Sequence, residues 1–165
     1  MARQALQQEF DLQKSVDKVQ SAYSDCGLFF EKPIQPFVDP SLQIMGYSGF
    51  EKSNSYIVVS GFALQTRMLE GLVAHEMGHI YRTEQKHPSH DYKLLERLMA
   101  EKGFEPGFLR TALNHVQDIY ADDVAFKVIK QLGLPDTELQ NFFLNWIRTN
   151  AGGKNRSRCH GCKQR

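Results

Sequence analysis

The sequence predicts an α+β fold, with a helix at the N-terminus, a small mixed sheet after it and a helical C-terminal half. Three observations support this order. Apolar residues recur at helical spacing among polar ones near the N-terminus. Two short segments between residues 42 and 61 are apolar or β-branched, and polar residues separate them. From residue 63 onward the helical pattern returns and continues over several segments.

The first helix is expected over residues 3 to about 24. Its apolar positions lie at near-helical spacing between glutamine, lysine and aspartate residues: Leu6, Phe10, Val16, Val19 and Tyr23. Gly27, Pro33 and Pro36 then interrupt the pattern. Residues 25–37 are therefore expected to be irregular.

The two expected strands are residues 42–47 and residues 55–61. The second is rich in β-branched side chains, with Ile57, Val58 and Val59 in succession. The polar residues between the two segments suit a hairpin or a longer loop.

Four helices are expected in the rest of the chain. The first, over residues 63–83, carries apolar residues on several faces, which predicts a central and buried position. After a polar loop, a short amphipathic helix occupies residues 92–103 and stops at Gly103. A long helix over residues 105–131 and a last helix over residues 136–149 follow.

Length and composition limit the classes of function. The chain has 165 residues, of which 41% are hydrophobic, enough for one globular domain over residues 1–152. No apolar run approaches the roughly 20 residues of a membrane-spanning helix, and the N-terminus lacks the apolar core of a signal peptide. The three cysteines do not resemble a secreted disulfide framework. A cytoplasmic location and no membrane partner are therefore expected.

Residues 153–165 form a basic tail, with five lysine or arginine residues and no acidic one in a chain of formal net charge +1. The rest of the chain is thus mildly acidic, and a nucleic-acid partner is expected only through the tail. Cys159 and Cys162 in the tail form a single CxxC pair. Because a structural zinc site needs four ligands, this pair is half of such a site. Either a partner chain completes it or the two thiols stay free.

The central motif is His75-Glu76-Met77-Gly78-His79, in the helix expected to be buried. The two histidines are four residues apart, which places them one turn apart on the same helical face. Two imidazoles so placed can bind one zinc ion at about 2 Å each. Glu76 lies beside that face, where it can take a proton from a zinc-bound water. The simpler interpretation is a buried helix that happens to contain two histidines. Ala74 and Gly78 favour the metal site, because such small residues let another segment approach.

With these residues the chain resembles the zincin metallopeptidases, whose active-site helix carries the HExxH motif. The resemblance implies a zinc-dependent peptidase domain over residues 1–152 and a peptide or protein substrate. It also implies an edge strand before the helix that binds extended substrate by strand addition, and residues 55–61 are in the right place. The longer metzincin pattern is absent, because Arg82 and Gln85 stand where it has glycine and histidine.

In the gluzincin group, including the small minigluzincins, a second helix supplies an acidic third ligand. An aspartate four residues later hydrogen-bonds the first motif histidine. Asp118 and Asp122 match this spacing, so the resemblance implies Asp118 as ligand and Asp122 as the residue that orients His75 or His79. The usual ligand is glutamate. Since aspartate is one methylene shorter, the second helix must come closer.

Other assignments remain open at this stage. Asp118, Asp122 and Asp123 could instead form a solvated acidic face of their helix. SprT-like proteases, which are associated with DNA, take their third ligand from a histidine soon after the motif helix. His87 and His90 resemble that ligand.

Further residues are candidates for the remainder of the site. His115 is one turn from Asp118 on the same face and could contact substrate. A transition-state oxyanion needs a donor besides zinc, and the candidates are His115, Tyr120, Tyr92 and Tyr81. A non-catalytic binding module stabilised by metal would keep the two histidines but would not need Glu76. The presence of Glu76 therefore favours an enzyme.

Overall fold

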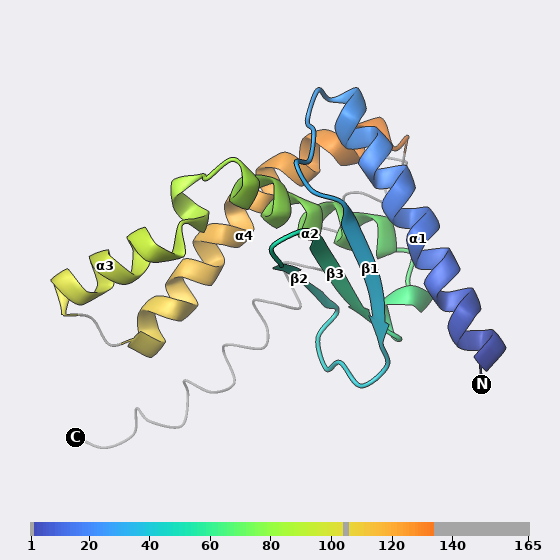
Figure 1. Ribbon diagram of the computed structural model, residues 1–165, viewed down its shortest axis with the longest axis horizontal. Coiled ribbons are helices and arrows are strands. Elements are labelled where there is room, and N and C mark those ends of the chain that lie inside the picture. The colour runs from blue at the N-terminus through green and yellow to red at the C-terminus, as the bar shows by residue number, and fades with distance from the viewer. Residues whose placement is uncertain (1, 104–105, 134–165) are drawn as a thin grey trace, which may run out of the picture. The chain divides into compact units, whose positions relative to one another are not determined.

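The computed structural model describes residues 2–103 and 106–133 (Figure 1). The chain divides into two compact units, Met1–Leu132 and Gly133–Arg165. The described elements all belong to the first unit, and they confirm the expected α+β order: an N-terminal helix, a three-stranded mixed sheet and a helical C-terminal half. The helix expected over residues 136–149 and the tail cysteines lie outside the described residues.

Helix α1, Ala2–Asp25, confirms the first expected helix. One face of it has no exposed surface, and this face consists of Leu12, Val16, Val19 and Tyr23. These positions follow the helical period, so α1 presents a continuous apolar stripe to the core. The Tyr23 hydroxyl donates a 2.8 Å hydrogen bond to the backbone carbonyl of Ala74 in helix α2, Leu69–Glu84, which fixes one helix against the other.

The sheet has the strand order β1-β3-β2. Strand β1 (Ile34–Asp39) runs parallel to β3 (Ser55–Ser60), and β2 (Gly46–Phe50) runs antiparallel to it. Since β3 is the central strand, the expectation that residues 55–61 form an edge strand is wrong. The apolar run explains why: Ile57 and Val59 have no exposed surface, as is typical of a strand inside a sheet rather than at its border.

The two outer strands also differ from the sequence expectation. Strand β1 lies mostly in the segment expected to be irregular. Pro36 has no N–H to donate to a neighbouring strand, but β1 is an edge strand, and an edge strand tolerates this loss. Strand β2 begins at Gly46, late in the expected segment, and continues to Phe50. Glycine serves close packing here, since a Cβ atom at Gly46 would lie 2.8 Å from the backbone oxygen of Val58.

Helix α2 occupies the centre of this unit, as its apolar pattern predicts. A short 3-10 turn, Ala63–Gln65, precedes it, so the single helix expected over residues 63–83 is divided in two. Every α2 residue from Gly71 to Gly78 is buried. The helix contacts α1, the sheet and the last described helix (Figure 1).

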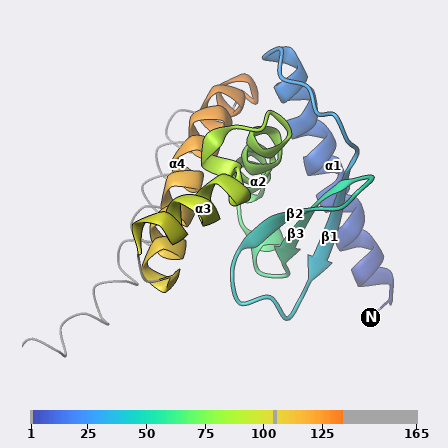
Figure 2. The ribbon, with the colours of Figure 1, turned by 60° about the vertical axis from the view of Figure 1, so that its left-hand side comes forward.

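A 3-10 turn, Pro88–His90, leads from α2 to helix α3, Tyr92–Lys102. Gly103, with φ 62°, ends α3 in the left-handed conformation, as expected. Helix α4, Pro106–Gln131, then packs along α2, and Figure 2 shows the two side by side. Among the described residues, no helix combines the length and apolar character that crossing a membrane requires.

Candidate metal centre

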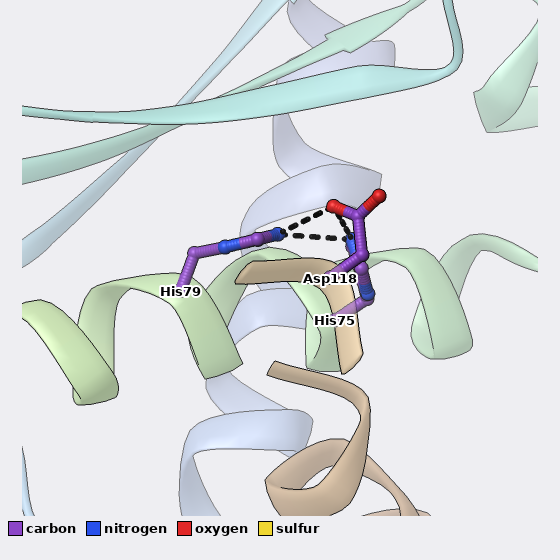
Figure 3. Close-up of side chains that lie close together, drawn as sticks. All are labelled: His75, His79 and Asp118. Atoms are coloured by element: carbon purple, nitrogen blue, oxygen red, sulfur yellow. Dashed lines mark hydrogen bonds and ion pairs between the residues drawn. The ribbon is translucent and has the colours of Figure 1, made fainter. Parts of the chain in front are cut away.

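The two histidines of the HExxH motif face each other on one side of α2. The Nε2 atoms of His75 and His79 are 3.1 Å apart, and Figure 3 shows both rings directed at the same point. Their side chains are largely shielded, with 6% and 16% of their surface exposed. The spacing of four residues thus places both histidines on one face of the helix, as the sequence predicts.

Helix α4 adds a carboxylate to this pair. The Oδ1 atom of Asp118 lies 3.5 Å from Nε2 of His79 and 4.0 Å from Nε2 of His75 (Figure 3). Two ligand atoms bound tetrahedrally at about 2.0–2.2 Å from a zinc ion are about 3.4 Å apart. In the described part of the chain, these three residues are the group whose ligand atoms converge in a way that could hold a metal ion.

The close approach of α4 to α2 depends on Gly78. A Cβ atom at this position would lie 2.5 Å from the backbone oxygen of Ala121 and 3.1 Å from its Cα atom. The helices therefore touch through their backbones at this turn, and a larger residue would force them apart. This contact lets the side chain of Asp118 reach both histidines. The two helices are thus as close as an aspartate ligand, one methylene shorter than glutamate, requires.

His75 is held from the side opposite the convergence point. Its Nδ1 atom is 2.7 Å from Oδ1 of Asp122. Because an ionised carboxylate only accepts hydrogen bonds, Nδ1–H of the imidazole donates, and Nε2 of the neutral ring keeps its lone pair. The structure therefore places Asp122 against His75 rather than His79.

His79 also has a partner behind it. Its Nδ1 atom is 2.9 Å from Nε2 of His90, in the turn after α2. The two nitrogens of an imidazole point in different directions, so His90 lies away from the convergence point where Asp118 is found. Burial lowers the pKa of His90 to about 3, and the charges of His79, His87 and Arg82 act in the same direction. His90 is thus a neutral neighbour of His79 and does not join the converging group.

The charges at the site favour a cation. Burial alone would lower the pKa of His75, but its hydrogen bond with Asp122 and the charge of Glu76 together raise it above the ordinary value. Burial would raise the pKa of Asp118, but the interaction with His79 at 3.5 Å and the charge of His75 lower it. Two imidazole nitrogens and an ionised carboxylate are therefore directed at the same position. Such a group can bind a proton, or a divalent metal ion that all three ligand atoms contact.

Glu76, the predicted general base, lies within the buried part of α2 and keeps 5% of its surface exposed. Its carboxylate raises the pKa of the adjacent His75. A carboxylate with so little contact with water needs polar or charged surroundings, and a cation beside His75 would supply them. The catalytic role of Glu76 stays a prediction.

The three aspartates at this part of α4 do not share one solvated face. Asp118 and Asp122 are directed at the histidines, whereas Asp123 is 56% exposed and pairs with Arg82 at 3.0 Å and with Lys127 at 3.5 Å. The three aspartates thus differ in their contacts: Asp118 and Asp122 face the histidines, whereas Asp123 pairs with Arg82 and Lys127.

His115 and Tyr120 lie at the rim of the site. Nδ1 of His115 is 3.9 Å from Oδ2 of Asp118, with half of its side chain exposed. The ring of Tyr120 packs on His87 with 4.6 Å between the centroids. The contact with Asp118 keeps His115 a candidate for contact with substrate, whereas the contacts found for Tyr120 join it to His87 and Arg82.

The other two tyrosines proposed as oxyanion donors lie elsewhere. Tyr81 packs in an aromatic cluster with Tyr23 and Phe30, at centroid distances of 6.4 Å and 6.2 Å. Tyr92 is 59% exposed at the start of α3. None of the contacts found for either residue joins it to the converging group.

Residues 38–145 match the model of a family of unknown function, DUF5781. This match spans well over half of the chain. The chain belongs to the DUF5781 family. No curated protein and no solved structure matches it.

The region shared with the DUF5781 family begins within β1 and contains α2 and α4. All the residues gathered at the candidate metal centre therefore lie inside it, whereas the whole of α1 and the tail cysteines lie outside. The family description assigns no activity. Any function must be argued from the site itself.

Sequence reasoning did not predict the contact between His79 and His90. The available signal is the segment His87-Pro88-Ser89-His90, with two histidines three residues apart around a proline. In a 3-10 turn, residues three apart lie on the same side. The turn Pro88–His90 has this geometry, with His87 as its N-cap.

Proposed function

We propose that this protein is a zinc-dependent metallopeptidase of the zincin type. His75, His79 and Asp118 would hold the metal, and Glu76 would act as general base. The observation that carries the proposal is the convergence of the Asp118 carboxylate on the two motif histidines, at 3.5 Å and 4.0 Å. A helix with two histidines by chance would have no reason to receive an acidic side chain from another helix at this point.

Three protein ligands leave one position of a tetrahedral zinc ion open, as catalytic sites require. Bound zinc would supply a Lewis acid that polarises a carbonyl group and makes water more acidic. In this arrangement Glu76 takes the proton of the attacking water and passes it to the leaving amine. Asp122 keeps His75 oriented, and His115 is placed to contact the substrate or the developing oxyanion.

The substrate strand has to be reassigned, because β3 is central in the sheet. Strand β2 (Gly46–Phe50) is an edge strand and contacts α2, the helix that carries the motif. An extended peptide would add to the sheet along the outer edge of β2, with backbone hydrogen bonds supplying affinity without strict sequence choice. Peptide or protein substrates are therefore proposed.

The SprT-like alternative needs a loop histidine as metal ligand. His90 is the nearer of the two candidates, but its Nε2 atom is bound to Nδ1 of His79, on the side away from Asp118. His87 is engaged with Ser89 and Tyr120 instead. This geometry favours Asp118 as the third ligand.

The experiment that tests the activity compares the zinc-loaded protein with its Glu76→Gln variant on a fluorescently labelled unfolded protein. The variant keeps the shape of the side chain and removes the base. We expect zinc content to be unchanged and hydrolysis to fall by at least about a hundredfold. Hydrolysis that survives in the variant would show that Glu76 is not the base. No hydrolysis in the parent despite bound zinc would favour a non-catalytic, metal-stabilised module.

A further inference from the structure

A chain of hydrogen bonds extends from His79 through the turn that follows α2. Nδ1 of His79 is 2.9 Å from Nε2 of His90, and Nδ1 of His90 is 2.8 Å from Oγ of Ser89. The same hydroxyl is 2.8 Å from Nδ1 of His87. His90 and Ser89 are buried, with 5% and 7% of their surface exposed, so water does not readily substitute for the bond between them.

One hydrogen bond determines which atom donates in each of the others. The backbone N–H of Ser89 donates to Nδ1 of His87, at 3.3 Å. This nitrogen is therefore an acceptor without a proton. The Ser89 hydroxyl, which also contacts it, donates its proton to it and keeps its lone pairs for another donor. The donor on that side is Nδ1–H of His90.

A neutral His90 that donates from Nδ1 has an unprotonated Nε2. Nε2 of His90 then accepts from Nδ1–H of His79. A neutral His79 protonated on Nδ1 has its lone pair on Nε2, and that atom faces Asp118 at 3.5 Å. The backbone of the turn thus selects, through the side chains of His87, Ser89 and His90, the tautomer of His79 that can bind a metal.

We propose that His90 is a positioning residue, which holds His79 in the metal-binding tautomer and orientation through the Ser89–His87 turn. The inference rests on the proposed metal site. His90 would orient His79 as Asp122 orients His75. Ligand histidines in metal sites characteristically donate their second N–H to such a partner, whose loss weakens metal binding about 10- to 100-fold. His90 contacts no metal in this scheme.

The test compares His90→Leu with His90→Gln in the full chain. Leucine fills similar space and offers no acceptor, whereas the amide oxygen of glutamine can accept from His79. Zinc affinity is measured by competition with a chromophoric chelator, with Cys159 and Cys162 replaced by serine in every sample. We expect a loss of about 10- to 100-fold for leucine, a change of only a few-fold for glutamine, and one zinc per chain for both at saturation.

A second measurement tests the direction of the bonds. Long-range ¹H–¹⁵N NMR spectra of the zinc-loaded protein distinguish the two tautomers of each histidine. We expect His90 to carry its proton on Nδ1 and His87 on Nε2. A proton on Nε2 of His90 would overturn the proposed direction, because that atom could not then accept from His79.

The outcomes separate the two proposals. Absence of zinc in the parent would overturn the proposed function and this inference with it. Zinc in the parent with equal affinities in the leucine and glutamine variants would overturn only the role of His90. Loss of the bound zinc in both variants, with zinc retained in Asp118→Ala, would make His90 a ligand and would contradict the assignment of a positioning role.

Discussion

At the scale of single residues, the candidate site depends on which nitrogen of each imidazole is hydrogen-bonded to a neighbouring side chain and which is left to bind a metal. His75 and His79 both have Nδ1 engaged, by Asp122 at 2.7 Å and by His90 at 2.9 Å. Both Nε2 atoms are thereby directed at Asp118. The two histidines could be predicted from helical spacing, which fixes which residues share a face, whereas the roles of Asp118 and Asp122 were expected from the resemblance to gluzincins. His90 could not be placed in the same way, since it lies in a turn with no repeating period.

Asp122 offers a test of this orientation. Asp122→Asn removes the charge and can turn an amide N–H toward Nδ1 of His75, which favours the wrong tautomer. We expect zinc affinity to fall about 10- to 100-fold, measured by chelator competition. Asp123→Asn is the matched control, because this neighbour pairs with Arg82 at the surface, and its zinc affinity should be that of the parent. Equal losses in the two variants would point to a general effect of charge.

His90 gives the metal-free protein a particular pH dependence. Its pKa is lowered from 6.5 to about 3 in the folded state, first by burial and then by the charges of His79, His87 and Arg82. Between these values the unfolded imidazole binds a proton that the folded one does not. The contribution of His90 to stability is therefore complete above pH 6.5 and is lost progressively as the pH falls toward 3.

The measurement is the urea midpoint of the chelator-treated protein at about pH 7 and about pH 5, values on either side of an ordinary histidine pKa. We expect the parent to lose more stability on acidification than the His90→Gln variant, which has no ring to protonate. An identical loss in both proteins would mean that His90 is accessible to protons in the folded state.

At the scale of elements, the contact of α2 with α4 at Gly78 decides whether Asp118 reaches the histidines. Gly78→Ala would place a methyl group 2.5 Å from the backbone oxygen of Ala121. We expect the free energy of unfolding to fall by about 1–3 kcal/mol and zinc affinity to fall with it, as seen by urea unfolding and chelator competition. Gly107→Ala in α4 is the control, since a Cβ atom there would meet nothing within 4 Å. A Gly78→Ala protein with parental zinc affinity would contradict the account.

The helices were predictable as elements, whereas the sheet was only partly so. The helical period and the stop at Gly103 are local signals, and α1, α3 and α4 follow them. Strand β1 contains Pro36 and strand β2 contains Gly46, residues that usually mark turns. Their presence in strands depends on an edge position and on close packing against β3. Neither condition can be read from a neighbouring residue.

At the scale of the whole molecule, the fold joins residues that are distant in the chain. The motif lies in α2 and its acidic partners lie in α4, with α3 between them in sequence. Helix α1 supports α2 from another side through the hydrogen bond of Tyr23 to Ala74. A metal bound by His75, His79 and Asp118 would therefore link α2 to α4. The order of elements followed from the sequence, but the packing that closes the site did not.

The most direct test of the central claim is the amount of zinc bound per chain. The sample is the full chain with Cys159 and Cys162 replaced by serine, alongside the same protein carrying Asp118→Ala, both exchanged into buffer with excess zinc and then desalted. We expect about one zinc per parent chain, held by two histidines and one carboxylate, and a clear loss in the variant. One zinc in both proteins would contradict Asp118 as the third ligand, and no zinc in the parent would contradict the metallopeptidase itself.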